Sequence, residues 1–264
     1  MSTNPPGLWC PFATHKPIPE AWTQRAIDTR AVVVHSAGGH GELYGWWQSD
    51  ASHGLESTFF ICDDQTAGYL DGEIVQYLGL GIKADANGEA NSFAASIETA
   101  STVNAGERWT PAQAESLTLL LDWICTVAPK VERRLMAHPT DAGIAWHVQF
   151  GAPGPWTQVR GKVCPGPERI KQLQAEIIPA VAAMANHPTP TPIDPQELTM
   201  ADITEITKRL DAIDAEQARQ GKQLDKLYQD YGVSREPSGR PGDNGSKRYQ
   251  FGRIFLWVRD LAKG

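Results

Sequence analysis

A short loop near residue 160 combines a thiol, an amine and two prolines. Residues 161–167 read Gly-Lys-Val-Cys-Pro-Gly-Pro. Because proline and glycine interrupt both helices and strands, we do not expect Cys164 to pack in a core. The charge of Lys162 is expected to lower the pKa of the thiol, which suits either a reactive nucleophile or a metal ligand. The rest of the chain has to decide between these two roles.

A histidine in the first part of the chain favours the metal ligand. His35 follows the apolar run Ala31–Val34 and precedes a loop, residues 36–41, that is rich in glycine. The apolar run predicts a buried strand, so His35 would lie at a strand end, either in a site or as a core histidine bonded to a backbone carbonyl. Zinc accepts imidazole and thiolate together, and a catalytic zinc has three protein ligands and one open position. We therefore interpret His35, a later histidine and Cys164 as zinc ligands.

A carboxylate at the end of a second predicted strand could take part in the same chemistry. Residues 92–99 alternate enough to predict a strand, and Glu98 lies near its end. By itself this position favours a solvated carboxylate at a strand end over a functional one.

The elements that would position these side chains are predicted from periodicity and from turn residues. Residues 58–62 and 72–78 predict two strands that could pair as a hairpin, and residues 43–47 predict the start of a short helix. Thr110, Pro111 and Gln113 predict a helix start, with threonine as the N-cap. Apolar residues spaced by three and four continue this helix: Leu117, Leu120, Leu121 and Ile124.

The segment after this helix is harder to interpret. Residues 134–138 predict a further short strand, whereas residues 139–155, which include His147, are expected to be irregular. Residues 168–184 predict a last helix that is kinked or interrupted at Pro179.

Composition limits the classes of protein. The chain has 264 residues, 41% hydrophobic and 21% charged, which is the composition of a globular protein. A formal net charge of −7 argues against a nucleic-acid partner, because duplex binding depends on cations at the phosphates. Four irregularly spaced cysteines favour a reducing compartment over a disulfide framework. We recognise no signal peptide at the N-terminus and no apolar run of about 18 residues.

The order of these motifs resembles a known family. Val-Val-Val-His35-Ser, Ser-Ile-Glu98 and Lys162-x-Cys164-Pro-Gly-Pro occur in that order, with the Thr-Pro-Ala-Gln helix start of residues 110–113 between the last two. This arrangement resembles the zinc-dependent N-acetylmuramoyl-L-alanine amidases of type 2, in the superfamily of the peptidoglycan recognition proteins. The resemblance covers roughly residues 25 to 180, and the Lys-x-Cys-Pro-Gly loop is its most specific part. The segments around Trp146-His147 and Trp156-Thr157 are similar to endolysins of actinobacteriophages.

The resemblance implies a fold, a metal and a reaction. The fold would be α/β, with a mixed β-sheet flanked by helices and zinc at one end of the sheet. Zinc would be held by His35, a second histidine and Cys164, and it would activate water for cleavage of the amide between N-acetylmuramic acid and L-alanine of the peptidoglycan stem peptide. Glu98 would move the proton of the water, and Lys162 would stabilise the developing oxyanion.

Two positions depart from the family pattern. Ala137-His138-Pro-Thr-Asp141 fits the place where many members have the second histidine ligand, but His147 better fits the actinobacteriophage pattern, and we choose His147. Some members have a tyrosine near the metal in the second strand, where this chain has Glu56-Ser57-Thr58. Glu98 and Lys162 would then carry the proton transfer and the charge stabilisation.

The predicted organisation has four parts. The amidase domain is expected over residues 1–186, followed by a Pro/Thr-rich linker over residues 187–200. Residues 201–232 carry a heptad pattern that predicts an α-helical coiled coil, and residues 201–231 could form a homo-oligomer; the alternative is a single amphipathic helix that packs on the domain. Residues 233–264 predict a flexible basic tail with a short apolar segment that could dock on the coil, a membrane surface or a cell-wall component.

Three functions remain open at this stage. The first is a zinc amidase that acts as an endolysin and waits in the cytoplasm of the infected host until release to the cell wall. The second is a non-catalytic peptidoglycan-binding module of the same fold, although the presence of Cys164 favours catalysis. The third is a hydrolase with Cys164 as the nucleophile and a histidine as its base.

Overall fold

The computed structural model describes residues 5–48 and 55–185, which lie within one compact unit that ends at residue 187. The predicted linker (187–200), the coiled coil (201–232) and the basic tail (233–264) lie outside the described residues. In the described part of the chain, no helix combines the length and the apolar character needed to cross a membrane.

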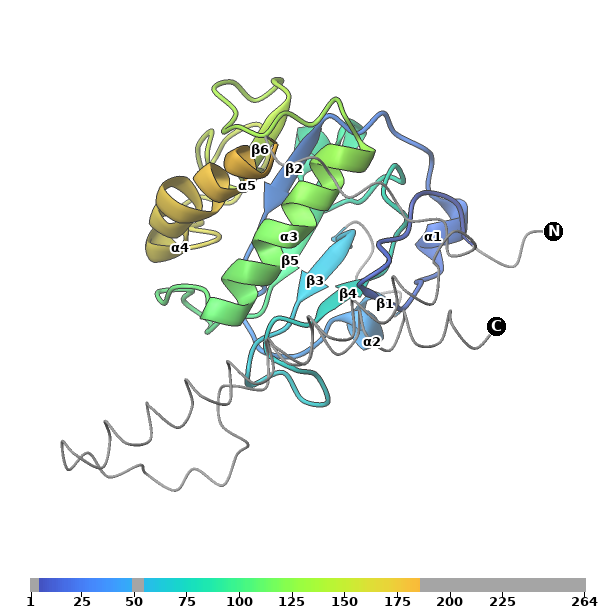
Figure 1. Ribbon diagram of the computed structural model, residues 1–264, viewed down its shortest axis with the longest axis horizontal. Helices are drawn as coiled ribbons and strands as arrows, with labels where there is room; N and C mark the ends of the chain where they lie inside the picture. The colour runs from blue at the N-terminus through green and yellow to red at the C-terminus, as the bar shows by residue number, and fades with distance from the viewer. Residues whose placement is uncertain (1–4, 49–54, 186–264) are drawn as a thin grey trace, which may run out of the picture. The chain divides into compact units, whose positions relative to one another are not determined.

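The described residues form a six-stranded mixed sheet with the strand order β1-β4-β3-β5-β2-β6 (Figure 1). β2, β5 and β6 run parallel to one another, β3 runs parallel to β5, and only β4 runs antiparallel to its neighbour β3. The predicted hairpin of residues 58–62 and 72–78 is therefore confirmed. The strands are β1 (Thr14–His15), β2 (Ala31–Val34), β3 (Phe59–Ile61), β4 (Ile74–Gln76), β5 (Ala94–Thr99) and β6 (Gly143–Trp146).

The long helix α3 (Pro111–Val127) begins as the sequence predicts. The Thr110 side chain accepts a hydrogen bond from the backbone N–H of Gln113, and the Gln113 side chain accepts one from the backbone N–H of Thr110, which completes a capping box. Four apolar residues of α3 are fully buried against the sheet, together with residues of β2, β3 and β5: Leu117, Leu120, Leu121 and Ile124.

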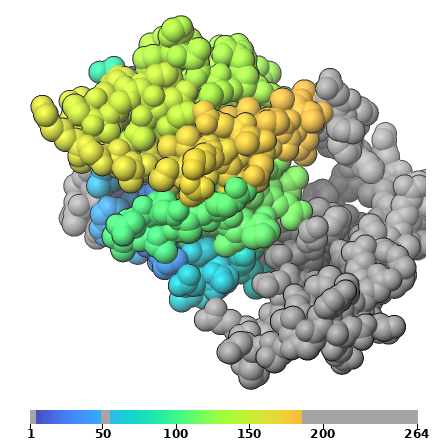
Figure 2. All heavy atoms as spheres, turned by 90° about the vertical axis from the view of Figure 1, so that its left-hand side faces the viewer, coloured from blue at the N-terminus to red at the C-terminus, as the bar shows by residue number. Residues whose placement is uncertain are grey.

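The last helical segment packs beside α3 (Figures 1 and 2) and lies on the same face of the sheet (Figure 1). It consists of α4 (Pro167–Gln172), a π-helical turn (Leu173–Ile177) and α5 (Ile178–Met184). The predicted interruption at Pro179 lies one turn too late. Proline lacks an N–H and its ring collides with the carbonyl four residues earlier, so the helix widens before Pro179 rather than at it.

The other face of the sheet is covered by shorter elements. They are α1 (Glu20–Thr23), α2 (Tyr44–Trp47) and the 3₁₀ turn η2 (Gly88–Ser92). Trp47 of α2 packs with Phe60, Val75 and Tyr77 in one cluster. Trp156 packs with Val33 and Ala145 in another cluster, next to η2.

Two expectations for the segment after α3 are wrong. Residues 134–138 do not form a strand, because only Leu135 makes a single bridge, to Ile144. Residues 139–155, expected to be irregular, contain β6, whose first three residues are buried. A run of four residues that starts with glycine has too weak a local pattern to predict a strand. It is stabilised by its pairing with β2 along its whole length.

Candidate active site

The parallel register of three strands brings three predicted site residues into one row. Val34 of β2 is paired with Ile97 of β5 on one side and with Trp146 of β6 on the other. Each of these three residues is followed in the sequence by a predicted site residue: Val34 by His35, Ile97 by Glu98 and Trp146 by His147. Because parallel strands end at the same edge of a sheet, these three side chains emerge next to one another.

Alternation along the strands decides the face on which these side chains lie. Val34 points toward α3, so His35 points to the opposite face, as Val33 does. The same alternation sends His147 to the face of Ala145. The ring centroids of His35 and His147 are 4.3 Å apart.

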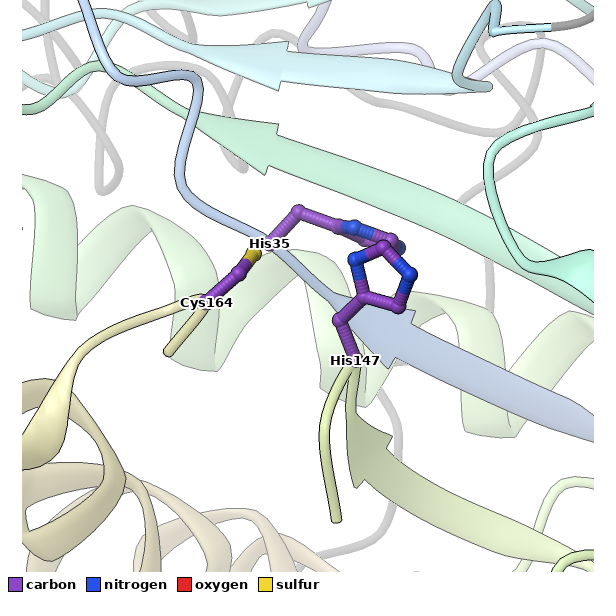
Figure 3. Close-up of side chains that lie close together, drawn as sticks. All are labelled: His35, His147 and Cys164. Atoms are coloured by element: carbon purple, nitrogen blue, oxygen red, sulfur yellow. The ribbon is translucent and has the colours of Figure 1, made fainter. Parts of the chain in front are cut away.

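Cys164 reaches this row from a loop that is distant in the sequence. The backbone N–H of Ser36 donates a hydrogen bond to Cys164 Sγ over 3.2 Å, which fixes the loop at the end of β2. One possible ligand atom from each of His35, His147 and Cys164 lies within 4.8 Å of the other two (Figure 3). His138 is exposed and is not part of this group. Of the two candidate histidines, the structure brings His147 to the site.

The hydrogen bonds of the two histidines leave the same ring nitrogen available. His147 Nε2 lies 3.2 Å from the carbonyl oxygen of Trp156, which can only accept, so this nitrogen carries the proton. His147 Nδ1 is buried and has no hydrogen-bond partner among residues 5–48 and 55–185. His35 Nε2 lies 2.8 Å from Asn87 Oδ1, which leaves His35 Nδ1 on the side of the site. A buried ring nitrogen that accepts no hydrogen bond is suited to ligate a metal, while the bond at the other ring nitrogen orients the ring.

Burial keeps both rings neutral, as metal ligation requires. It lowers the pKa of His35 well below its usual range, and the neighbouring His147 adds to this effect. Burial, together with the charge of Lys162, lowers the pKa of His147 to about 4. Both imidazoles therefore offer a lone pair at neutral pH without first losing a proton.

Cys164 differs from what its loop suggested. It is buried, with 7% of its surface exposed, because the loop folds over the end of β2. Burial and the nearby charge of Glu98 raise the pKa of the Cys164 thiol to about 12. The expected lowering by Lys162 is present but smaller. A thiol with this pKa is a poor nucleophile at neutral pH, whereas a metal cation in contact with the sulfur would stabilise the thiolate.

Glu98 and Lys162 complete the site. Glu98 Oε1 lies 3.7 Å from His35 Nδ1, and within the described part of the chain the buried Glu98 Oε2 has no hydrogen-bond partner. Burial raises the pKa of Glu98 to about 7, and the charge of Lys162 partly offsets this rise. Lys162 is exposed at the rim of the site. A carboxyl group that titrates near neutral pH can both accept and return a proton.

These residues line a cleft of about 430 Å³. Its walls come from the loop after β2, from α2, from the loop after β5 and from the Cys164 loop. Apolar side chains at its rim include Leu43, Trp46, Leu55, Val103 and Val163. Residues 56–58, which the sequence analysis considered as a further part of the site, do not line this cleft, and Glu56 accepts a hydrogen bond from Gln24 instead.

Two groups that contact the histidines could not be found from the sequence. Asn87 lies in an irregular stretch without periodicity, and its only local signal is the Asn-Gly turn pair that it forms with Gly88. The contribution of Trp156 is its backbone carbonyl, which has no signature in side-chain chemistry.

Comparison with known proteins identifies a family for the chain. The family model described as N-acetylmuramoyl-L-alanine amidase matches residues 24–167, more than half of the chain. No curated protein sequence matches the chain.

Solved structures with a similar arrangement share little sequence with the chain. The amidase LysC from Clostridium intestinale URNW is 16% identical, with 61% of this chain and 92% of that chain covered and a TM-score of 0.41. A selenomethionine derivative of AmpD is 19% identical, with 61% and 90% covered and a TM-score of 0.44. A mutant endolysin from Bacillus subtilis is 17% identical, with 65% and 97% covered and a TM-score of 0.41.

The family match includes His35, Glu98, His147 and Cys164, the residues that the register and the loop bring together. The chain belongs to the N-acetylmuramoyl-L-alanine amidase family.

Proposed function

We propose that the chain is a zinc-dependent amidase that cleaves the bond between N-acetylmuramic acid and L-alanine in peptidoglycan. The observation that carries this proposal is the convergence of His35, His147 and Cys164, whose ligand atoms lie within 4.8 Å of one another. The family match supports the amidase reaction.

The donor set fits zinc. Two neutral imidazoles and one sulfur are borderline and soft ligands, which suit zinc better than calcium or magnesium. Three protein ligands would leave a fourth position for water or substrate on the side of the cleft. When bound there, zinc would lower the pKa of water and polarise the scissile carbonyl.

Glu98 is the proposed general base and acid. Its carboxylate faces the cleft beside His35, so it can take a proton from the attacking water. The same group can then return the proton to the leaving amine of L-alanine. A pKa of about 7 suits both steps near neutral pH.

Lys162 is the proposed stabiliser of the oxyanion. It lines the cleft, and its positive charge acts on Glu98 and on His147. A cation at this rim would favour the negative charge that develops on the carbonyl oxygen of the scissile amide.

The proposal also includes a biological role. The segments Trp146-His147 and Lys162-x-Cys164-Pro-Gly-Pro resemble endolysins of phages. We therefore propose that the chain acts in cell-wall lysis after its release from the cytoplasm of an infected host.

Mass spectrometry of the products from purified peptidoglycan tests the reaction. We expect release of peptides that begin with L-alanine, intact glycan strands, and loss of release after treatment with a chelator and its return with zinc. Disaccharides or internally cut peptides would contradict the assigned bond.

The same assay separates the alternatives. Activity that survives complete removal of zinc, but not alkylation of Cys164, would indicate the cysteine nucleophile. The raised pKa of Cys164 argues against that role. Sedimentation with the wall without any release would indicate a binding module.

Self-association through residues 201–231 is a separate proposal that rests on the heptad pattern. Several copies on one wall would raise the effective concentration of the amidase. Light scattering of the full chain and of residues 1–186 tests it: the full chain should show a mass of two or more chains, and a monomeric full chain would contradict it.

A further inference from the structure

Asn87 is fully buried and lies between His35 and β5. Its Oδ1 lies 2.8 Å from His35 Nε2, and its Nδ2 donates to the carbonyl oxygen of Ala94 over 3.4 Å. The backbone N–H of Asn87 donates to Asn91 Oδ1 over 2.7 Å. The amide group is thus held from two sides.

These contacts determine which nitrogen of His35 carries the proton. The carbonyl of Ala94 can only accept, so the NH₂ group of Asn87 must face it. The oxygen of Asn87 must then face His35, and an oxygen requires a proton on His35 Nε2. His35 Nδ1 is left with its lone pair toward the site.

The next residues along the chain support the other histidine. Gly88 has a φ of +56°, and a Cβ atom at this position would lie 2.6 Å from the carbonyl oxygen of Trp156. The backbone N–H of Glu89 donates to the carbonyl of Pro155 over 3.2 Å. The Trp156 carbonyl is the acceptor for His147 Nε2. The segment of residues 87–89 therefore supplies the acceptor of His35, through Asn87, and lies against the acceptor of His147.

We propose that Asn87 and Gly88 are positioning residues for the metal centre. Asn87 orients His35 directly through its side-chain oxygen. Gly88 allows the close approach that keeps the Trp156 carbonyl in place for His147. This inference rests on the zinc site of the proposed function, but it concerns residues that would touch neither zinc nor substrate.

One short turn thus carries both contacts that hold the histidine rings: that of Asn87 with His35 and that of Gly88 with the Trp156 carbonyl. Ligand orientation by an outer hydrogen bond is commonly worth 10- to 100-fold in metal affinity. Because residues 87 and 88 are adjacent, a change in the backbone of this turn should affect both rings at once. A change in one side chain should affect one ring only.

Long-range ¹H–¹⁵N NMR spectra of the metal-free full chain test the orientation without any metal. We expect His35 and His147 each to be a single tautomer with the proton on Nε2. In Asn87→Leu, His35 should lose its single tautomer, whereas His147 should keep it. A proton on Nδ1 of His35 in the unmodified protein would overturn the proposal, whether or not the variants fold.

Zinc affinity, measured by competition with a chromophoric chelator, provides the second readout. Asn87→Leu should weaken zinc binding roughly 10- to 100-fold. Asn87→Asp keeps an oxygen toward His35 but loses the donor to Ala94, so it should retain most of the affinity. Equal loss in both variants would indicate a merely structural role for Asn87.

Gly88→Ala should also weaken zinc binding, with disorder of the His147 tautomer in the NMR spectra. Gly106→Ala is the matched control, because a Cβ atom there meets no atom of the described residues within 4 Å. Unchanged affinity in Gly88→Ala would contradict the role of Gly88. If the unmodified chain bound no zinc, the proposed function would fail; if it bound zinc and Asn87→Leu bound it equally, only this inference would fail.

Discussion

Two polar clusters, each with a largely buried centre, lie on opposite faces of the sheet beside two consecutive residues of β5, Glu98 and Thr99. Glu98 points to one face, where it forms what we call the site cluster together with His35, His147 and Cys164. Thr99 points to the other face, toward a cluster that we call the Arg169 cluster: Thr99, Glu107, Trp109 and Arg169. One residue along a strand therefore separates two very different environments.

The Arg169 cluster is saturated with hydrogen bonds. Arg169 is 1% exposed and donates to Thr99 Oγ1 over 2.9 Å, to the Ala100 carbonyl over 2.9 Å and to Glu107 Oε1 over 3.0 Å. Thr99 Oγ1 also accepts from Trp109 Nε1 over 2.9 Å and donates to the His35 carbonyl over 2.7 Å. This network stabilises the strand ends from behind.

The site cluster is unsaturated. Glu98 Oε2 and His147 Nδ1 are buried and have no partner among the residues that the structure describes, and burial shifts the pKa of both groups away from its usual range. Unpaired buried polar atoms destabilise a fold. The comparison indicates that the Arg169 cluster contributes stability, whereas the site cluster keeps atoms available for a metal and for proton transfer. Substitutions in the site cluster should therefore lower activity or metal content more than stability, whereas substitutions in the Arg169 cluster should lower stability more than activity.

The largest effect is expected for Cys164→Ala. Removal of the sulfur leaves two ligands, so the variant should lose zinc and should fall to the activity of the chelated enzyme. Metal analysis and the peptidoglycan assay measure both. Cys125→Ala, which removes a buried thiol from the core, serves as the control and should keep zinc and rate. Full metal content in Cys164→Ala would contradict the ligand assignment.

Glu98→Gln should keep zinc and lose roughly 10²- to 10⁴-fold in rate, because the amide cannot transfer the proton. The metal-free variant should be at least as stable as the unmodified protein, since a neutral amide replaces a buried carboxyl group that lacks one partner. Thermal unfolding of both proteins in chelator measures this. A variant that was both active and much less stable would remove the distinction between the clusters.

Lys162→Ala should keep zinc and lower kcat by roughly 10²- to 10³-fold, which is the usual cost of one oxyanion-stabilising group. Its stability should change by less than about 0.5 kcal/mol, because Lys162 is exposed. Lys171→Ala is the matched control, since Lys171 is also exposed and forms an ion pair with Glu168 on α4. Equal rates for the two variants would exclude Lys162 from catalysis.

Arg169→Met should show the opposite signature. It removes a buried cation that donates to Thr99, Ala100 and Glu107, although Thr99 keeps its bond from Trp109 and Glu107 keeps its bonds from Thr102, so we expect a loss of about 3 kcal/mol in the free energy of unfolding. At temperatures where the variant is folded, zinc content and rate should remain close to normal. Arg108→Met, which breaks an exposed pair with Glu176, is the control and should cost less than about 1 kcal/mol. A stable but inactive Arg169→Met would contradict the division of roles.

The smallest effect is expected from Glu107. Burial raises the pKa of Glu107, but hydrogen bonds from Thr102 and the charge of Arg169 outweigh it, so the pKa lies below its usual value. A depressed pKa contributes stability above the pKa of the unfolded chain, and this contribution is lost as the pH falls through the pKa of the folded state. Glu107→Gln should be less stable at pH 7 by about 1 kcal/mol or less. The difference should disappear in acid, and a difference that grew below pH 4 would contradict this account.

Several parts of this molecule could be predicted from short stretches of sequence. The run Ala31–Val34 predicted β2, and Thr110 with Gln113 predicted the start of α3, because these signals depend on residues that are close along the chain. Cys164 and His35 were chosen as site residues from residue type and local breakers. In the structure, both residues lie in the same group of possible metal ligands.

Other parts depended on distant segments. β6 is stabilised by pairing along β2, so its four residues carried too little local pattern, and the position of His147 beside His35 follows from that pairing. The burial of Cys164 depends on Ser36, which is far away in the sequence, and this burial reversed the expected direction of its pKa shift.

Local sequence patterns were enough to place β2 and the start of α3 and to show that a sulfur and imidazoles were available to hold a metal. Contacts between distant segments establish which histidine joins His35, which ring nitrogen is free, and that Asn87 and the Trp156 carbonyl hold the rings. The reason is physical: strand and helix signals depend on neighbours along the chain, whereas strand register, burial and hydrogen-bond partners depend on segments that meet only in the folded protein.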